Sequence, residues 1–371
     1  MDRSGKSKFF QQLASIFLDF PISFKDQTEY IISNLRKFIS SIFHSKETGW
    51  SEQIKEDLTN LELNGREEES LDLIQKILKQ NEMKLEIENM YLKVNSIRRI
   101  DFFTPYQIEY FLNRIKEKKF LDSDLFFMYK SSRGPDTLKI NDIDKKTLVV
   151  FDYTSPKYRA NISKFMLNIK MRYFLINLSI FFKKTLEEEE DELNALERSF
   201  FYMSNNFHDS QDNANIVVVF TNFLEFEENL KRYPSILDHL SKYSDDLKGK
   251  SAKEIIEMVY HSMMKINNLQ GDPRFLDFHI LDLIFPHQVF ECFQKTLPHF
   301  QIEEPPNLKI LTSKFISSFP LSVQNYYYYP DHFKSQTLSF MFCLKILERK
   351  GIIARIPKFV VFEILKKINQ V

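Results

Sequence analysis

The sequence predicts an α+β protein that is predominantly helical, with a small mixed β-sheet in the middle of the chain, flanked by helices. Apolar residues recur at helical spacing over much of the 371 residues, which is the pattern of amphipathic helices. Two short apolar runs, 147–153 and 215–223, interrupt this pattern and are rich in β-branched and aromatic residues, as strands are. Only 7 glycines are present, which argues against a glycine-loop enzyme and against tight glycine turns.

The N-terminal region, 1–100, is expected to be helical. Residues 8–45 form two amphipathic segments broken near Pro21. The stretch 51–95 places apolar residues on one helical face, namely Leu71, Ile74, Ile77 and Leu78. Thr104-Pro105 then begins another helix, because threonine is a favourable N-cap and proline suits the first helical position.

The pattern changes in the middle of the chain. We predict a short strand near Pro135, and a buried strand over Thr147 to Tyr153. A long helix is expected from Tyr158 to Lys184, followed by a second strong strand from Asn215 to Phe223. Together these elements form an α/β segment over 101–243.

The C-terminal part of the chain returns to a helical pattern from Glu225 to Val371. A polar stretch around 244–253 separates it from the middle segment. The sequence therefore predicts three regions, with a helical C-terminal region at 250–371.

Composition restricts the class of protein further. Basic and acidic residues balance at 51 each, which excludes an overall basic nucleic-acid-binding surface, although local patches remain compatible. The two cysteines, Cys292 and Cys343, favour a reducing compartment. The longest apolar run, 173–182, is shorter than the roughly 20 residues that a membrane helix needs. With no signal-peptide pattern at the start, we expect an intracellular, cytoplasmic protein with no membrane partner.

Two aspartates stand at the ends of predicted strands. Asp136 follows Pro135 just before or on a short strand, and Asp152 lies at the end of the 147–153 strand. Neighbouring strands are about 4.8 Å apart, so acids at adjacent strand ends can share a metal ion. Mg²⁺ and Mn²⁺ prefer carboxylate oxygens, and such ions activate water for phosphodiester hydrolysis.

The segment that follows concentrates positive charge. Residues 157–184 contain seven basic side chains and no acidic ones, namely Lys157, Arg159, Lys164, Lys170, Arg172, Lys183 and Lys184. On a helix, this set would attract backbone phosphates. One of the lysines would orient the attacking water or stabilise developing negative charge.

The order of these features resembles a known nuclease domain. Pro135-Asp136, an apolar strand ending in Asp152-x-Thr154, a lysine-bearing helix and a further apolar strand resemble the cap-snatching endonuclease domain of bunyavirus-type polymerases. That domain belongs to the PD-(D/E)xK nuclease fold. The resemblance covers about residues 100–243 and implies a two-metal endonuclease that uses Mn²⁺ or Mg²⁺ to cleave RNA.

The resemblance also implies a role for individual residues. Asp136 would bridge two metal ions, Asp152 would be the second acidic ligand, and Glu109 would be a further ligand from an upstream helix. Lys170 would be the catalytic lysine, with Lys164 as its competitor. The RNA backbone would be held by Lys157, Arg159 and Arg172.

Structural interpretations of the same residues stay open. Asp136 suits a turn, Asp152 suits a helix N-cap, and the basic stretch suits a solvated helix face. The chain has Thr154 where many family members carry lysine, and no histidine between His44 and His208. A nuclease fold that has lost its activity is therefore one alternative.

Another alternative is a non-catalytic helical interaction or adaptor protein. Its partner would bind the basic C-terminal segment from Lys345 to Val371. Gly5-Lys6-Ser7 matches the end of a phosphate-binding loop, but the first glycine and the preceding strand of that motif are missing. The sequence alone does not favour nucleotide binding.

Overall fold

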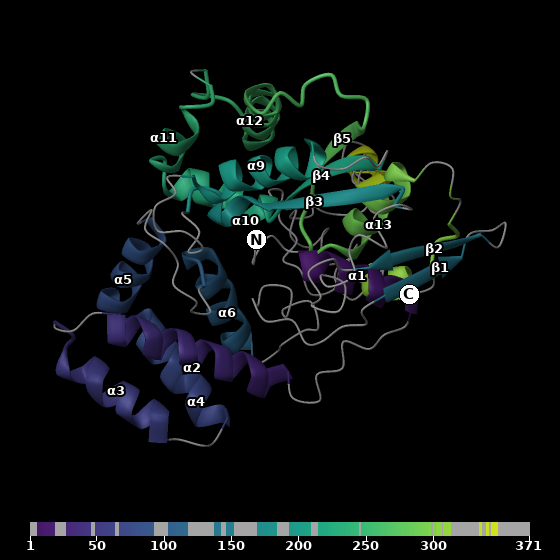
Figure 1. Ribbon diagram of the computed structural model, residues 1–371. Helices are drawn as coiled ribbons and strands as arrows, with labels where there is room; N and C mark the ends of the chain where they lie inside the picture. Colours follow the sequence, from purple (N-terminus) through teal and green to yellow (C-terminus); the bar gives the residue numbers. More distant parts are fainter. Residues whose placement is uncertain are drawn as a thin grey trace. The chain divides into compact units, whose positions relative to one another are not determined.

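The structure is a computed structural model, and it confirms a mostly helical α+β fold (Figure 1). The residues that it describes are 6–18, 27–45, 49–63, 67–92, 103–117, 137–141, 146–151, 169–183, 193–208, 214–244, 246–297, 300, 302–305, 307–312, 334–335, 339–340 and 343–347. Among these residues, no helix combines the length and the apolar character that crossing a membrane requires.

Two compact units interleave along the chain. The first comprises Met1–Phe9, Ile22–Asp136 and Phe151–Ile284. The second comprises Phe10–Pro21, Thr137–Val150 and Phe285–Val371. Each unit takes segments from all three regions expected from the sequence, and the division into 1–100, 101–243 and 250–371 stays a prediction.

The N-terminal helices form where the apolar periodicity places them. Helix α1 spans Lys6–Leu18, and α2 to α6 span Gln27–Ser45, Glu52–Leu63, Glu67–Lys79, Asn81–Leu92 and Pro105–Glu117. The apolar faces of α2, α4 and α6 are buried, including Leu35, Ile74, Ile77, Leu78 and Ile108. Phe103 joins α2 to α6, because its ring lies edge-on to Phe38 at 5.2 Å and to Phe111 at 5.6 Å.

The first unit also contains a three-stranded parallel sheet. Its strands are β3 (Met171–Asn177), β4 (Asn215–Thr221) and β5 (Phe275–Ile280), hydrogen-bonded in that order. Helix α9 (Ala195–His208) connects β3 to β4, and α10, α11 and α12 connect β4 to β5. These last helices span Phe223–Arg232, Ile236–Leu240 and Ala252–Ile266.

Both faces of the sheet are covered. The central strand β4 is buried from Ile216 to Thr221, as expected for a parallel strand with packed layers on either side. On one face, Tyr260 of α12 packs against Phe220 and Phe278, at ring distances of 6.2 Å and 4.4 Å. Tyr173 lies on the opposite face by its register in β3 and packs against Phe9 of α1 at 5.5 Å.

The structure corrects two secondary-structure predictions. Within the expected helix 158–184, residues 171–177 form strand β3, and a short 3-10 turn follows at Leu178–Ile180. A short apolar run fits a buried strand as well as a helix, and β4 supplies the partner that selects the strand. The expected helical stretch from Glu225 onward contains β5, which is short and partly exposed and therefore lacks a strong apolar signal.

The second unit contains a separate pair of strands. Strands β1 (Thr137–Asn141) and β2 (Thr147–Phe151) form a two-stranded antiparallel sheet. The strand expected at 147–153 is therefore present, but it was wrongly predicted to be buried, since Val149 is 48% exposed. In the same unit, Phe17 of α1 packs against Phe290 and Phe293 of α13 (Pro286–Thr296) at 6.0 Å and 5.9 Å.

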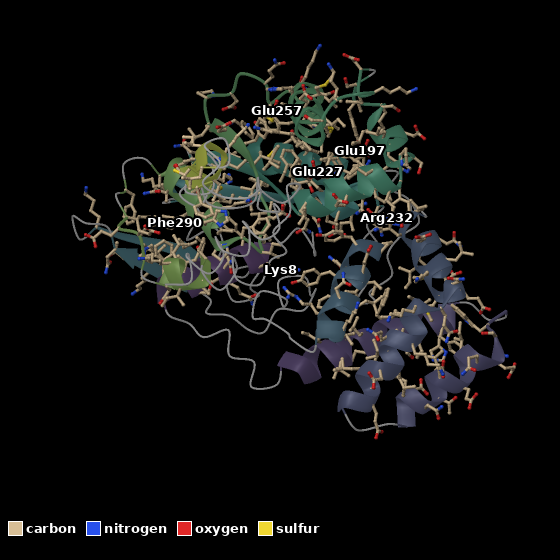
Figure 2. All side chains as sticks on the ribbon, turned by 180° about the vertical axis from the view of Figure 1, so that it is seen from behind. Lys8, Glu197, Glu227, Arg232, Glu257 and Phe290 are labelled. Carbon is tan, nitrogen blue, oxygen red and sulfur yellow. The ribbon has the colours of Figure 1, made fainter. Side chains whose placement is uncertain are left out.

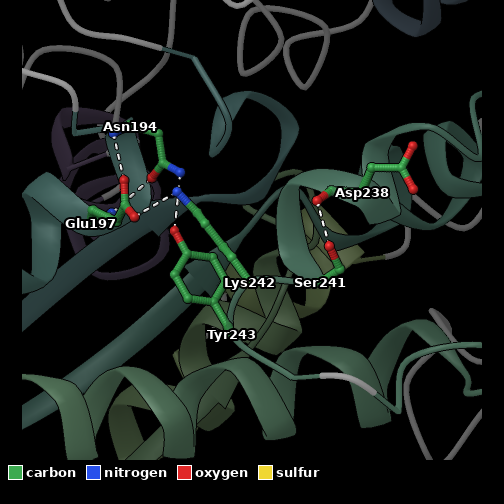
Figure 3. Close-up of polar contacts among 6 residues, drawn as sticks. All are labelled: Asn194, Glu197, Asp238, Ser241, Lys242 and Tyr243. Atoms are coloured by element: carbon green, nitrogen blue, oxygen red, sulfur yellow. Dashed lines mark hydrogen bonds and ion pairs between the residues drawn. The ribbon is translucent and has the colours of Figure 1, made fainter.

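Helix α9 is fixed by polar contacts at its N-terminus (Figure 3). Asn194 and Glu197 form a capping box, because each side chain accepts the backbone N–H of the other at 2.9 Å. The Asn194 amide also donates to the Tyr243 hydroxyl at 3.0 Å, and Lys242 pairs with Glu197 at 2.6 Å. Ser241 donates to the Asp238 carbonyl at 2.7 Å. The contacts of Tyr243 and Lys242 tie the start of α9 to the segment after α11.

Tyr91 and Lys183 join helix α5 to the sheet region. The buried Tyr91 hydroxyl donates to the Ser179 carbonyl at 3.0 Å and accepts from the Asn229 amide at 2.8 Å. The buried Lys183 ammonium donates to the carbonyls of Met90 at 2.9 Å and of Tyr91. Burial lowers the pKa of Lys183 to about 7, and these helix C-terminal carbonyls provide acceptors for its charge.

Removing the Tyr91 hydroxyl is expected to destabilise the protein. Tyr91→Phe leaves the Ser179 carbonyl and the Asn229 amide without this partner in a buried site, which costs about 1–3 kcal/mol. Urea denaturation followed by circular dichroism measures the change. Tyr260→Phe is the matched control, because Tyr260 is also buried but its hydroxyl has no hydrogen bond to any described residue. Equal stability losses in the two variants would contradict this account.

Candidate functional site

The carboxyl ends of the three parallel strands define one edge of the sheet. Strands β3, β4 and β5 end there at Asn177, Thr221 and Ile280. In open parallel α/β sheets, ligands bind outside this edge, between the loops that follow the strands. We call this region the carboxyl edge, and its polar residues are the candidate site.

Glu225 is the central acidic residue of the carboxyl edge. It lies in the first turn of α10, just after β4, and is 2% exposed. Its carboxylate accepts a hydrogen bond from the Thr104 hydroxyl and another from the Gln107 amide at 3.3 Å. Burial raises the pKa of Glu225 to about 7, although the hydrogen bond from Thr104 opposes the shift.

Thr104 and Gln107 are held in place by helix α6 itself. The backbone N–H of Gln107 donates to the Thr104 hydroxyl oxygen, and the backbone N–H of Thr104 donates to the Gln107 side chain, both at 3.3 Å. This reciprocal pair is a capping box, and it confirms Thr104 as the expected N-cap. The start of α6 therefore presents two rigid donors to Glu225.

Asp282 is the second buried acid at the carboxyl edge. It follows β5 and is 5% exposed. Its carboxylate accepts the backbone N–H of Leu224 at 2.9 Å, at the start of α10. Asp282 thus acts as an N-cap from a distant part of the chain. Burial raises its pKa to about 7, while backbone hydrogen bonds from Leu224 and Phe223 act against the shift.

Asparagines close the loop between β4 and α10. Asn222 adopts a left-handed backbone conformation, with φ of 61°, which asparagine tolerates better than most residues. Its amide donates to the Asn177 side-chain oxygen at 2.7 Å, and that oxygen also accepts from the Ser179 backbone N–H at 3.0 Å. The ends of β3 and β4 are therefore locked together by side chains.

The start of helix α1 reaches the same edge. Helix α1 begins at Lys6, directly after Gly5. Lys8, marked in Figure 2, is partly buried and close enough to Glu225 for their charges to interact. Burial lowers the pKa of Lys8 to about 7, and the Glu225 charge works against this shift.

The structure describes three of the residues expected at a nuclease site. Glu109 is exposed and forms an ion pair with Arg232 at 2.5 Å, between α6 and α10. Lys170 is exposed, and it precedes β3 instead of lying on a helix. Arg172 is on β3, opposite Ile216, so the expected basic helix is wrong for both cations. The basic residues suggested a helix face, but pairing with β4 makes this segment a strand.

The remaining expected residues lie outside the described residues, namely Asp136, Asp152, Lys157, Arg159 and Lys164. Within the described part of the chain, no group of three or more His, Cys, Asp or Glu side chains is arranged to hold a metal ion. The expected Mn²⁺ or Mg²⁺ site and its ligand set stay predictions.

Sequence reasoning missed Lys8, Glu225 and Asp282. Glu225 and Asp282 follow strands, and β5 was not recognised, so their meeting at one edge was not foreseen. The available signal was the Asn215 to Phe223 strand, because the residues just after a parallel strand lie at the ligand-binding edge. Gly5-Lys6-Ser7 was a second signal. No protein-family model and no curated protein matches the sequence.

The backbone of Asn222 gives a test of this loop. Asn222→Ala and Asn222→Gly both remove the hydrogen bond to Asn177, but alanine also pays about 1–2 kcal/mol in the left-handed region. The alanine variant is therefore expected to be less stable than the glycine variant by about 1 kcal/mol, as measured by urea denaturation.

Asn268 provides the comparison, because it has φ of 54° and an exposed side chain. Asn268→Gly is expected to stay close to the wild type. If Asn222→Ala and Asn222→Gly prove equally stable, the left-handed conformation does not constrain this loop.

Proposed function

We propose that the protein binds a nucleotide at the carboxyl edge, with the start of helix α1 holding the phosphates. The observation that carries this proposal is the position of that helix start. Gly5-Lys6-Ser7 is the final part of a phosphate-binding loop motif. Its helix begins at Lys6 and brings Lys8 beside Glu225, at the edge where parallel sheets bind nucleotides.

The chemistry of the proposed site follows from the motif. The positive end of the helix dipole favours phosphate at the start of α1. In this motif the lysine, here Lys6, reaches the terminal phosphates, and the hydroxyl, here Ser7, binds Mg²⁺. Mg²⁺ would accompany the nucleotide, because it is usually held by substrate phosphates and few protein ligands.

Glu225 and Asp282 shape the site instead of binding the metal ion. Both carboxylates are buried and already accept hydrogen bonds from the protein. Those hydrogen bonds occupy part of the acceptor capacity that a metal ion would use. Their role in this proposal is to fix α10 and α6 around the edge, so that the loops after β4 and β5 have one arrangement.

Nucleotide binding is tested by replacing the motif lysine. Lys6→Ala is expected to weaken binding of fluorescently labelled ATP or GTP, in the presence of Mg²⁺, by at least about tenfold, because the charge-assisted contact to the phosphates is lost. Fluorescence titration with both nucleotides measures the affinity and the base preference.

Lys253→Ala is the matched control. Like Lys6, Lys253 lies in the first turn of a helix, here α12, and it pairs with Glu257. The control is expected to bind like the wild type. The proposal is wrong if the wild type binds neither nucleotide, or if Lys6→Ala binds as tightly as the wild type.

A metal-dependent RNA endonuclease is the second candidate. The antiparallel pairing of β1 and β2 favours it, because the first residue of β1, Thr137, and the last residue of β2, Phe151, lie at the same end of the pair. Asp136 and Asp152 are the next residues along the chain. In the nuclease proposal these two carboxylates, which lie outside the described residues, would bind a divalent ion.

Melting with Mn²⁺ tests the nuclease candidate. A metal ion that binds only the folded state raises the melting temperature, so the wild type should be stabilised and the Asp136→Ala/Asp152→Ala variant should not. Cleavage of single-stranded RNA is measured in the same samples. Stabilisation without cleavage would support a nuclease fold without activity. Absence of both effects would exclude this candidate and leave the partner-binding interpretation of the segment from Lys345.

A further inference from the structure

Helices α2 to α6 form a body with a core of its own, which we call the N-terminal lobe. Its helices follow one another along the chain between residues 27 and 117. The apolar faces of α2, α4 and α6 are buried around Phe103. Asp57 of α3 is also buried, and it accepts hydrogen bonds from Lys76 at 2.6 Å and from Gln80 at 2.9 Å. The lobe is therefore held together by contacts between its own helices.

Two groups of contacts join the lobe to α10 and the sheet, and the first surrounds the end of α5. The Tyr91 ring packs against Phe182 at 5.5 Å and against Tyr233 at 5.7 Å. Its hydroxyl accepts a hydrogen bond from Asn229 of α10 at 2.8 Å. One turn earlier in α5, Glu88 accepts from the Tyr233 hydroxyl at 3.1 Å. This group combines the burial of an aromatic ring with hydrogen bonds.

The second group lies at the start of α6 and consists of polar contacts. Thr104 and Gln107 donate hydrogen bonds to the buried carboxylate of Glu225. Glu109 pairs with Arg232 in an exposed position, where an ion pair contributes little to stability. Polar interfaces between parts of one chain permit relative motion, in contrast to large apolar ones.

Helix α10 carries both groups of contacts on one face. Glu225, Asn229 and Arg232 are separated by four and then three residues, which places their side chains on the same side of the helix. The two groups differ in what separation costs. Water replaces the hydrogen bonds at the start of α6, whereas separation at Tyr91 exposes an apolar ring to water. The α6 side is therefore the easier one to open.

We propose that the N-terminal lobe is hinged on α10, with Tyr91 as the pivot and the start of α6 as the end that opens. In the closed position, which the structure shows, Thr104 and Gln107 cover Glu225. In the open position, α6 leaves the first turn of α10 and exposes this part of the carboxyl edge to solvent. The hinge goes beyond the proposed nucleotide site and does not depend on it, since it involves only contacts within the protein.

The single tryptophan of the chain makes this motion measurable. Trp50 belongs to the lobe, where its ring is buried and stacks on Phe43 at 5.9 Å. It serves as the donor for resonance energy transfer in the full chain. The acceptor dye is attached to Lys253→Cys on α12, in a Cys343→Ser background that removes the exposed thiol and keeps the buried Cys292. Time-resolved decay of Trp50 then gives the distribution of lobe-to-α12 distances.

Glu225→Ala tests the end that opens. It removes the acceptor of two buried hydrogen bonds and is expected to raise the open population about tenfold, which appears as a second donor–acceptor distance. Asp57→Ala is the matched control, because Asp57 is also a buried carboxylate that accepts two hydrogen bonds, but it lies inside the lobe. The control is expected to keep the wild-type distribution. An unchanged distribution in Glu225→Ala, or an equal change in Asp57→Ala, overturns the hinge.

Two further variants complete the test. Tyr91→Leu removes the pivot and is expected to broaden the distribution instead of adding one second distance, so identical distributions in Tyr91→Leu and Glu225→Ala overturn the role of Tyr91. Circular dichroism and the Trp50 emission maximum confirm that each variant is folded. If Glu225→Ala unfolds, Gln107→Ala replaces it, since that change deletes one donor and keeps the Thr104 hydroxyl. The same second distance is then expected at a smaller population, and its absence overturns the hinge.

Discussion

The enclosed carboxylate of Glu225 is the contact on which the arrangement of the first unit depends. Three elements that are distant in sequence meet at it: the start of α1 through Lys8, the start of α6 through Thr104 and Gln107, and its own helix α10. A buried carboxylate without partners would cost several kcal/mol, so this group stays buried only while its neighbours stay in place. Burial and hydrogen bonding are therefore coupled across the whole edge.

The same edge combines fixed loops with buried polar side chains. Asp282 caps α10, and Asn222 ties β4 to β3, so the loops after the strands are fixed by side chains from other segments. Such preorganisation is what a ligand site at the end of a parallel sheet requires. Lys6 and Ser7 of the phosphate-binding candidate belong to α1, the helix that supplies Lys8. A phosphate bound at the start of α1 would then lie on the same helix whose Lys8 interacts with Glu225.

The N-terminal helices and β4 could be predicted from the sequence, because strong periodicity and a β-branched run specify them locally. Thr104 was recognisable as an N-cap because threonine suits that position and the proline after it suits the first helical position. Strand β3 was not, since its apolar run suits a helix until β4 is available as a partner, and the basic residues around it suggested a helix face. Glu225 and Asp282 were not foreseen, because their meeting depends on strand order, which no local pattern encodes.

The proposed ligand site is the carboxyl edge of the parallel sheet. The most direct measurement is residue-level hydrogen exchange with and without a magnesium nucleotide at saturating concentration. A nucleotide bound at this edge is expected to slow exchange in the first turn of α1, in 222–226 and in 281–284. A change confined to the β1–β2 pair, or no change anywhere in the chain, would contradict it.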